Sequence, residues 1–578
     1  MSFRNRPVLD RKHRPRWQDE LRTQRLVVAG FALAVAAAIG IFGPTAWIGH
    51  YTSHLRPVAE VNGQTLDVDR VVGRMDIIGA ELRAIYLDLQ SQAGGLRDQL
   101  IQQQLNAVQQ QFASIAATAT DSLVVGRVLD GEAAKRKVSV SPGQVDTEVA
   151  SRQTLPERVK LSIITIPALP AGTVAGLLPT DADWAKAEAA AKTIVAALKG
   201  GADFAATATA KSHDASAQGG GLIGWVSAKD TDYPDYFTET QKAAVGTLLG
   251  PTKDATGYHI LRVDDRRAAG PNKALIDQLK AAGVSDAQYR AYVHDELMRR
   301  TFTDYFSNVV MTAYQPQRDV AQIFITADQG IPVPKQRIRH FLAQPIPGAQ
   351  DQSPATPAQW AAALARAKAF RAEAIKPGAN WTTLAATSDD PGSRSRGGDL
   401  GWYDPGSSQF VPEFKAAMAT LKVGQVSQPV KTQFGYHIIE VTDTRGSARS
   451  EGDRLLQALR ADPSRFAGLA KEQSEDVITA SKGGDFGWVI PYQLDDPVGS
   501  AIFALKTPNQ ISDLVETTSG FWIFKLLDSS ALRLVPSAQL EEVRTSGFPR
   551  WLQRLRTAAH VWVDSQFTTP ASGTTPGG

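Results

Sequence analysis

The sequence has no cysteine among its 578 residues, so disulfide bonds, thiolate metal sites and cysteine nucleophiles are all excluded. Histidine is also scarce, because only nine are scattered along the chain. A phosphate-binding loop of the GxxxxGK type is missing as well. We therefore expect no metal, no nucleotide and no other cofactor.

An excess of charge of one sign is missing too, because 62 basic and 59 acidic residues leave a net charge of only +3. Beyond the N-terminus the chain has no long basic stripe, so nucleic acid is not an expected partner. With 43% hydrophobic and 21% charged residues, the composition and length suit roughly three to five domains with hydrophobic cores.

The N-terminus combines a basic segment with an uncharged run. Residues 1–25 carry eight Lys or Arg against three acidic residues, and residues 26–49 carry no charge at all. As a helix, these 24 residues can cross roughly 30 Å of hydrocarbon, and Trp47 and Tyr51 stand where interfacial aromatics belong. The pattern predicts a single-pass anchor in the cell membrane, with a cytoplasmic N-terminus and an extracytoplasmic bulk. A cleaved signal peptide is the alternative.

Helical patterns flank the first part of the exported chain. Residues 58–71 predict a short strand, an Asn-Gly turn and the entry to a helix. A first helical block places five apolar residues on one face: Leu100, Ile101, Leu105, Val108 and Phe112. A second block spans 272–310, where Ser285 and Gln288 form a capping box.

Three related glycine motifs are the most informative feature of the chain: "GGLIGW" at 220–225, "GGDLGW" at 397–402 and "GGDFGW" at 483–488. A helical aromatic precedes the first glycine by 16, 16 and 17 residues, and "GYHI", "GYHI" or "GFWI" begins 32, 33 and 32 residues after the tryptophan. Each copy is predicted to run strand, helices, glycine turn, short helix and final strand. Such an internal repeat indicates three compact α+β modules.

The copies are unevenly spaced, because 177 residues separate Trp225 from Trp402 but only 86 separate Trp402 from Trp488. The third copy therefore lacks room for its own opening strand. Residues 319–326, "DVAQIFIT", resemble the opening strand of the second copy and stand just before it. We hypothesise that the second copy is inserted into the third.

The second copy contains "SDDPGS", "GGDLGW", "VPEF" and "FGYHII" in order, and over residues 335–443 it resembles the parvulin family of peptidyl-prolyl cis-trans isomerases. The "VAEVNG" segment and the helical blocks are similar to the chaperone part of SurA-like and PrsA-like exported foldases. Together with the anchor predicted above, the resemblance implies an α+β multidomain protein with a single N-terminal transmembrane helix, a helical chaperone-like domain and three parvulin-like modules, one complete and two degenerate.

This organisation predicts seven parts of the chain. They are a basic cytoplasmic segment (1–25), the anchor (26–49), the helical domain (58–157 plus 267–318), module 1 (158–266), module 2 (335–443), module 3 (319–326 plus 450–530) and a disordered polar tail (567–578).

The resemblance also implies which residues of module 2 act. The catalytic group consists of His340, Asp390, His437 and Thr432, and the substrate-binding pocket consists of Leu400, Phe410, Phe414 and Phe434. The acidic position falls on Asp390 by alignment, with Asp389 as its neighbour. The glycine motif itself is expected to be a turn rather than a chemical site, with Asp399 bracing it and Trp402 in the core.

The implied reaction is rotation about X-Pro bonds in unfolded or extended exported polypeptides. Peptide-bond rotation faces a barrier of roughly 18–20 kcal/mol because it breaks amide resonance. An apolar pocket that removes water from the amide favours the less polar, twisted state, so no nucleophile is required. The histidines are then expected to orient Thr432 and Asp390 rather than to transfer protons.

The histidine pair also sorts the copies. Module 1 keeps His259 but has Ser162, Ile163 and Ile164 where the first histidine should fall, and module 3 offers Gln322 and Trp522 at the two positions. We expect both modules to be inactive and to serve packing or polypeptide holding.

The leading interpretation of the chain is a membrane-anchored foldase whose second module isomerises X-Pro bonds. Two alternatives remain open, a non-enzymatic holdase and a membrane scaffold.

Overall fold

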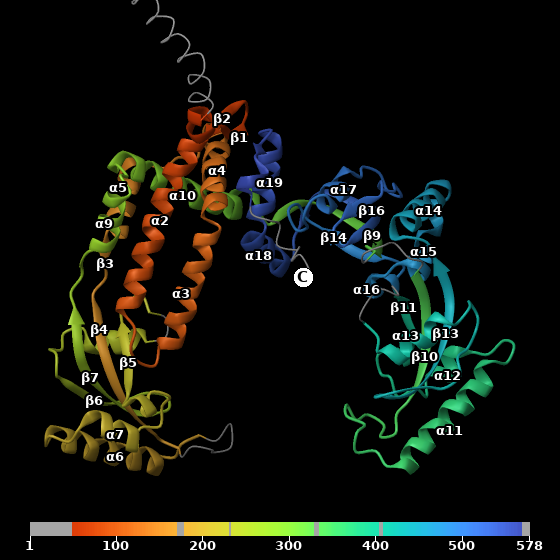
Figure 1. Cartoon of the computed structure of the whole chain (residues 1–578), viewed down its shortest axis with the longest axis horizontal. Helices are drawn as coiled ribbons and strands as arrows, with labels where there is room; N and C mark the ends of the chain where they lie inside the picture. The colour runs from red at the N-terminus through yellow and green to blue at the C-terminus, as the bar shows by residue number, and fades with distance from the viewer. Residues whose placement is uncertain (1–48, 170–177, 231–232, 329–334, 404–408, 569–578) are drawn as a thin grey trace, which may run out of the picture. The chain divides into compact units, whose positions relative to one another are not determined.

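The computed structural model (Figure 1) describes residues 49–169, 178–230, 233–328, 335–403 and 409–568. The predicted anchor lies outside these residues except for Gly49, and the polar tail lies outside them from residue 569. Within the described part, no single helix is long and apolar enough to cross a membrane. One bent pair, α3 (Asp98–Ala113) with α4 (Ile115–Arg136), passes by length and composition with a 73° bend.

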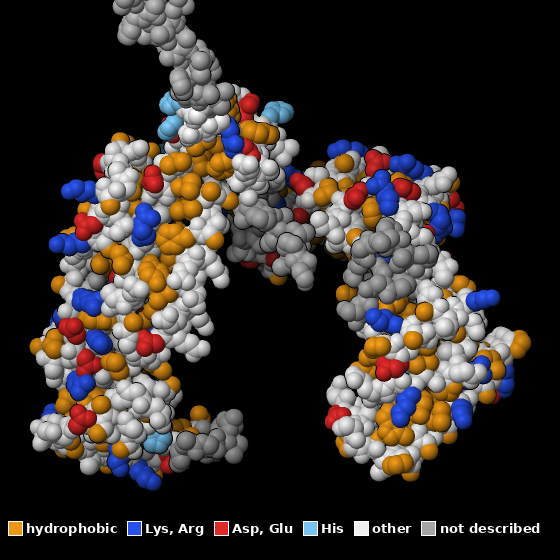
Figure 2. Space-filling view, in the orientation of Figure 1, with side chains coloured by type: hydrophobic (Ala, Val, Ile, Leu, Met, Phe, Trp, Pro, Cys, Tyr) orange, Lys and Arg blue, Asp and Glu red, His pale blue; other side chains and the backbone are white. Residues whose placement is uncertain are grey.

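The chain forms two compact units. The first comprises Met1–Tyr305 and Arg554–Gly578, and the second comprises Phe306–Gln553. Charged side chains of both signs are spread over the visible face of each unit (Figure 2), in keeping with the nearly balanced composition.

A helical domain and a small sheet make up one part of unit 1. Its elements are η1 (Tyr51–Leu55), β1 (Pro57–Val61), β2 (Gln64–Asp67), α2 (Val68–Ser91), α3, α4, α5 (Pro142–Arg152), α9 (Lys273–Ala281), α10 (Asp286–Tyr305), β17 (Trp562–Val563) and η6 (Ser565–Phe567). β1 and β2 form the predicted hairpin, and Asp67 caps α2 by accepting from the Arg70 amide at 3.0 Å. The C-terminal strand β17 joins β1, which the sequence patterns did not indicate.

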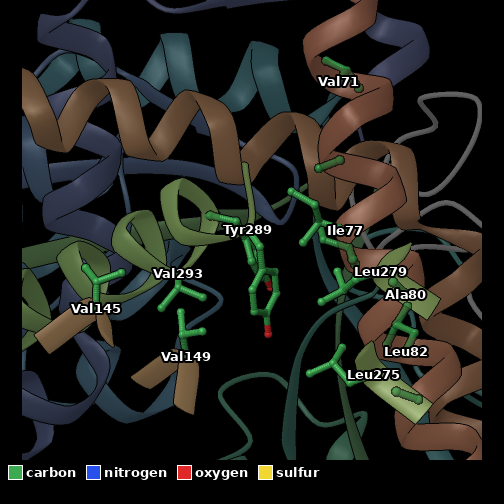
Figure 3. Packing of buried hydrophobic residues seen from close by; sticks show 14 of the residues in the cluster. Val71, Ile77, Ala80, Leu82, Val145, Val149, Leu275, Leu279, Tyr289 and Val293 are labelled. Atoms are coloured by element: carbon green, nitrogen blue, oxygen red, sulfur yellow. The ribbon is translucent and has the colours of Figure 1, made fainter. Parts of the chain in front are cut away.

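Tyr289 lies at the centre of the helical core. Figure 3 shows its ring between Val145 and Val149 on one side and Ile77 and Leu279 on the other. The Tyr289 hydroxyl donates to Glu81 at 2.9 Å, so this buried phenol has a polar partner.

Several expectations for this domain are confirmed and some are wrong. Ser285 and Gln288 form the predicted capping box. Leu100, predicted on the apolar face of α3, is 39% exposed because α3 packs through the side of the helix that carries the other four residues. Phe567, placed at the start of the predicted disordered tail, lies in η6 and packs against the helical core.

Module 1 also lies in unit 1. Its strands are β4 (Arg158–Pro167), β5 (Leu222–Val226), β6 (Leu248–Lys253) and β7 (Gly257–Arg267), in the order β5-β4-β7-β6. Its helices are α6 (Asp181–Lys199), α7 (Phe204–Lys211), η2 (Ala217–Gly219) and α8 (Pro234–Thr240), and the two-residue strands β3 (Thr154–Leu155) and β8 (Gly270–Pro271) pair beside it.

Module 2 repeats this arrangement in unit 2. Its strands are β10 (Lys335–Ala343), β11 (Asp399–Tyr403), β12 (Val430–Thr432) and β13 (Gly435–Arg445), in the order β11-β10-β13-β12. Its helices are α11 (Pro357–Ala374), α12 (Trp381–Ala385), η4 (Arg394–Arg396) and α13 (Pro412–Ala419). All strand pairs are antiparallel, and one face of the sheet packs on α11 while the other packs on α13.

Module 3 has the same strand order, β14-β9-β16-β15. Its elements are β9 (Tyr314–Thr326), α14 (Ala448–Ala461), η5 (Pro463–Arg465), α15 (Phe466–Gln473), α16 (Val477–Ala480), β14 (Asp485–Val489), α17 (Val498–Ala504), β15 (Val515–Thr517) and β16 (Gly520–Leu534). β9 pairs with both β14 and β16, as the insertion hypothesis requires.

The boundaries of these parts differ from the expected ones. The helical domain was expected to extend to residue 318, but η3 (Phe306–Val310) and β9 belong to unit 2. Two further helices follow module 3, α18 (Ser537–Ser546) and α19 (Phe548–Ala558). Phe306 is fully buried among Phe548, Trp551 and Tyr492, so these C-terminal helices cover the start of unit 2.

The glycine motif positions the opening strand of every module. In module 2, Gly398 accepts the His340 amide at 2.8 Å and has a φ of +82°. A Cβ atom at Gly398 would lie 2.2 Å from the His340 carbonyl oxygen, which explains the glycine. Gly221 accepts from Ile163, and Gly484 accepts from Gln322, both at 2.8 Å. Ile163, His340 and Gln322 are therefore structurally equivalent.

Candidate active site

The two predicted histidines come from neighbouring central strands of module 2. In the β10–β13 register His340 faces Ile439 and Leu342 faces His437, so the two histidines are diagonal neighbours on one sheet face. Their side chains are buried, and their Nδ1 atoms lie 3.2 Å apart. The structure thus brings the two predicted histidines together.

A linear hydrogen-bond network runs through this pair. His340 Nε2 lies 2.8 Å from Asp390 Oδ2, and His437 Nε2 lies 2.9 Å from Thr432 Oγ1. Asp390 also accepts from the Ser393 hydroxyl, and Thr432 accepts from the Phe434 amide at 3.1 Å. All four predicted catalytic residues thus belong to one network.

The network restricts the protonation of both rings. A carboxylate can only accept, so His340 carries a proton on Nε2. If His340 is neutral, its Nδ1 accepts from His437 and the Thr432 hydroxyl donates to His437 Nε2. If His340 is protonated, both hydrogen bonds reverse. His437 is neutral in either arrangement.

Burial supports the neutral state of His437. Removal from water, followed by the nearby charge of His340, lowers the pKa of His437 to about 3. The hydrogen bond from His340, assisted by the one from Ser393, holds the pKa of the Asp390 carboxyl well below its usual range. The site therefore contains one fixed carboxylate and one fixed neutral imidazole at neutral pH.

The neighbouring Asp389 has a different task. It pairs with Arg366 and accepts from the Gln344 amide at 2.7 Å. Asp390 rather than Asp389 is therefore the residue that contacts the histidines, in agreement with the alignment.

An aromatic wall covers the histidines. The Phe414 ring meets His437 edge-on at 5.1 Å and His340 at 5.9 Å between ring centroids, and Phe410 stacks on Phe414 at 4.8 Å. Phe414 is buried, whereas Phe410 and Leu400 are partly buried against the same core.

Phe434, the fourth residue predicted for the pocket, lies elsewhere. Its side chain is 40% exposed, and it lines a second hollow together with Trp360 and Gln433. Only its amide, through Thr432, joins the histidine network. Three of the four predicted pocket residues therefore lie together.

The acidic position is present in all three modules, which the sequence comparison of the copies missed. In each module one amide of the opening strand donates to a serine hydroxyl: Leu342 to Ser388, Thr165 to Ser212 and Phe324 to Ser474. The aspartate two residues after each serine is Asp390, Asp214 or Asp476. The shared Ser-x-Asp spacing is the sequence signal for this position. His213, which directly precedes Asp214, is exposed.

Module 1 surrounds its single histidine differently. His259 lies 3.1 Å from Glu239 through Nε2 and 3.2 Å from Asp254 through Nδ1, and Tyr236 packs on its ring at 4.9 Å. With Ile163 at the first position, no second histidine can complete the network. Neither carboxylate was predicted as a partner of His259.

A second feature that sequence reasoning missed is an arginine over each motif tryptophan. Arg267 covers Trp225 at 4.0 Å, Arg445 covers Trp402 at 4.2 Å, and Arg533 covers Trp488 at 3.8 Å. Each arginine comes from the last strand of its module, so this cation–π contact ties the glycine turn to the sheet. Asp399 braces the turn of module 2 by accepting from the Gly401 amide at 2.9 Å.

Within the described residues, no group of three or more His, Asp or Glu side chains could hold a metal ion. The residues gathered in module 2 are two histidines, a carboxylate, a hydroxyl and an apolar wall.

This fold and this site define a parvulin-type isomerase module. The family model described as the PPIC-type PPIASE domain matches residues 340–443 and 441–528, and a second model of the same description matches 147–267. Together the matches cover more than half of the chain, and the chain belongs to the PpiC-type peptidyl-prolyl isomerase family.

Among characterised proteins, the chain is similar to the chaperone SurA. It is 29% identical to SurA of Yersinia pestis over 331 residues, covering 56% of this chain and 58% of the relative. It is 28% identical to SurA of Pectobacterium atrosepticum over 370 residues, covering 63% and 66%. The chain thus matches less than two thirds of the length of these relatives. A solved PrsA isomerase from Bacillus anthracis is 23% identical, covering 36% of this chain and 77% of its own, with a TM-score of 0.14.

Proposed function

We propose that this chain is a membrane-anchored, extracytoplasmic foldase that catalyses X-Pro isomerisation through module 2. The observation that carries the proposal is the network from Asp390 through His340 and His437 to Thr432, with Phe414 against both imidazoles. Modules 1 and 3 keep the frame of this site without the histidine pair.

The geometry suits desolvation catalysis. A planar X-Pro amide is more polar than the twisted amide, so removing water from it lowers the rotation barrier. Phe414, Phe410 and Leu400 supply an apolar wall for the proline ring. The neutral His437 adds no charge that would solvate the planar amide, while Asp390 fixes the orientation of His340. No covalent intermediate or net proton transfer is needed.

The proposed location rests on the sequence. The uncharged run 26–49 and the basic segment 1–25 favour an anchor with the bulk of the chain outside the cytoplasm. Membrane fractionation and protease treatment of intact and permeabilised cells test this proposal. A soluble, cytoplasmic protein would contradict it.

A protease-coupled isomerisation assay on residues 335–445, which include all of β13, tests the catalytic proposal. We expect the fragment to accelerate cis-to-trans conversion of a proline tetrapeptide over the uncatalysed rate. A folded fragment without acceleration would instead support the holdase alternative. An aggregation assay with an unfolded client, run on the full chain, measures the chaperone part of the proposal separately.

A further inference from the structure

Module 3 contains a cavity of about 820 Å³ at the place where module 2 has its histidines. The correspondence follows from the backbone. Gln322 bonds to the glycine turn as His340 does, and Trp522 faces Phe324 as His437 faces Leu342. Thr517 pairs with Gly520 as Thr432 pairs with Gly435. The cavity is therefore a parvulin site with different side chains.

The replacements remove the catalytic network but leave the polar frame satisfied. Gln322 donates its amide to Asp476 at 2.5 Å, in the position of the bond between His340 and Asp390. The Trp522 ring packs on Phe324 at 4.2 Å and its indole N–H reaches Thr517 at 3.4 Å. Neither replacement can titrate, and the module keeps no imidazole in this site.

The same replacements leave space and apolar lining for a large apolar group in the cavity. Val498 begins α17, the counterpart of the helix that carries Phe414, so a small side chain stands where module 2 has an aromatic wall. Trp522, Phe486 and Leu494 supply apolar lining, and Phe486 is 37% exposed at the surface. A cavity of this volume accepts an aromatic side chain with part of its backbone.

The charge of the lining adds a second preference. It includes three carboxylates, Asp495, Asp496 and Glu516, and no lysine or arginine. Two of these pair with Arg550 and Arg449 from outside the cavity. Asp495 and Glu516 are largely exposed, and exposed ion pairs are weak, so an incoming cation can compete for them.

We propose that this cavity is a non-catalytic binding site for an extended polypeptide segment that carries an aromatic side chain beside a lysine or arginine. Binding requires no proline. The inference rests on the proposed function in taking polypeptide as the ligand class, and it assigns module 3 to retention of a segment while module 2 acts on another.

Fluorescence anisotropy tests the proposal with the full chain and a fluorescein-labelled, proline-free peptide, Gly-Ser-Lys-Phe-Arg-Ser-Gly. We expect Val498→Phe, which fills the cavity, and Phe486→Ala, which removes an exposed wall, each to weaken binding about tenfold or more. Val309→Phe is the matched control, since Val309 is 54% exposed in η3 and outside the cavity. Replacing the peptide's lysine and arginine with glutamate should weaken binding as well.

Unchanged affinity in both cavity variants would overturn the proposal, as would a loss of binding produced only by His437→Ala in module 2. Phe486→Ala keeps the test informative if Val498→Phe fails to fold, because the Phe486 side chain lies at the surface and its truncation should leave the fold intact. Isomerase activity of Val498→Phe is measured in parallel and should stay within twofold of the parent. If the parent chain has isomerase activity but does not bind the peptide, this inference alone is refuted. If it binds the peptide but has no isomerase activity, the proposed catalysis alone is refuted.

Discussion

At the scale of single residues, the three modules differ by what stands at two strand positions. His340 and His437 make a continuous network in module 2, Ile163 interrupts it in module 1, and Trp522 replaces its second half in module 3. The single buried histidine of module 1, His259, does not form such a network, because its ring nitrogens bond to Glu239 and Asp254 instead of to a second imidazole.

The first prediction concerns activity. In the full chain, His437→Ala should lower kcat/KM for a proline peptide about tenfold or more, because the hydrogen bonds that orient His340 and Thr432 are lost. Phe414→Ala should do the same by admitting water. His259→Ala should have no measurable effect, and a loss equal to that of the module 2 variants would contradict the assignment of the active module. Circular dichroism checks that each variant is folded.

The second prediction concerns pH. The pKa of His437 is about 3 in the folded chain and about 6.5 when unfolded, so the folded state binds fewer protons. The contribution of neutral His437 to the free energy of unfolding is therefore fully present above about pH 6.5. It is lost as the pH falls toward 3, by about 1.4 kcal/mol per pH unit. The lowered pKa of Asp390 acts at more acidic pH, below about 4.

Hydrogen exchange of β13 amides, corrected for intrinsic rates, measures this loss between pH 6 and pH 4.5. The His437→Gln variant serves as the control, because it cannot titrate and should show a flatter dependence. Equal slopes in both proteins would show that other groups set the acid sensitivity of module 2.

At the scale of elements, the glycine turn and the opening strand form one unit in every module. The second glycine approaches the backbone of the first-strand position so closely that a Cβ atom would overlap its carbonyl oxygen, at 2.3 Å for Gly221 and 2.6 Å for Gly484. In module 2 this contact holds His340 in register, so the turn contributes to the site without touching a substrate.

The third prediction compares two glycines of this turn. Gly398 and Gly401 have φ values of +82° and +84°, but only a Cβ at Gly398 meets backbone. Gly401→Ala should cost about 1–2 kcal/mol for its left-handed conformation and leave activity nearly unchanged. Gly398→Ala should also break the bond to the His340 amide and lower activity several-fold. Thermal unfolding and the isomerase assay measure both effects, and equal activity in the two variants would be inconsistent with the proposed role of the turn.

Sequence patterns sufficed for the strands, because these depend on local spacing, and the resemblance to the parvulin family supplied the residues of the histidine network. The resemblance assigned His340 and His437 to two strands that are neighbours in the sheet. The uneven spacing of the copies, together with the similarity of residues 319–326 to the opening strand of the second copy, identified β9 as the missing strand of module 3. The carboxylates around His259 and the pairing of β17 with β1 could not be predicted in this way. Those contacts depend on how loops and distant segments pack, and no spacing in the sequence encodes them.

At the scale of the whole chain, the two ends of module 2, which is inserted into module 3, lie next to each other. Lys335 and Arg445, the first residue of β10 and the last of β13, are direct partners across the sheet. Both ends also pair with Glu475 of module 3, which is largely buried. Burial lowers the pKa of Arg445 to about 10, yet its guanidinium stays charged at neutral pH. The ion pairs with Glu475 thus fix module 2 to its host module.

The fourth prediction follows from these adjacent ends. Deleting residues 335–445 and joining the flanks with a short Gly-Ser linker should leave β9 paired with β14 and β16, because no strand of module 2 belongs to that sheet. The deleted chain should lose isomerase activity to background, because the histidine pair of module 2 is removed. It should still bind the proline-free peptide within about threefold of the parent affinity. Glu475 loses both of its cationic partners in this variant, Lys335 and Arg445, so Glu475→Gln in the same background restores a neutral site. Residual isomerase activity in the deleted chain would assign catalysis to module 1 or module 3, and loss of the β9 pairing, followed by hydrogen exchange, would show that module 3 depends on its insert to fold.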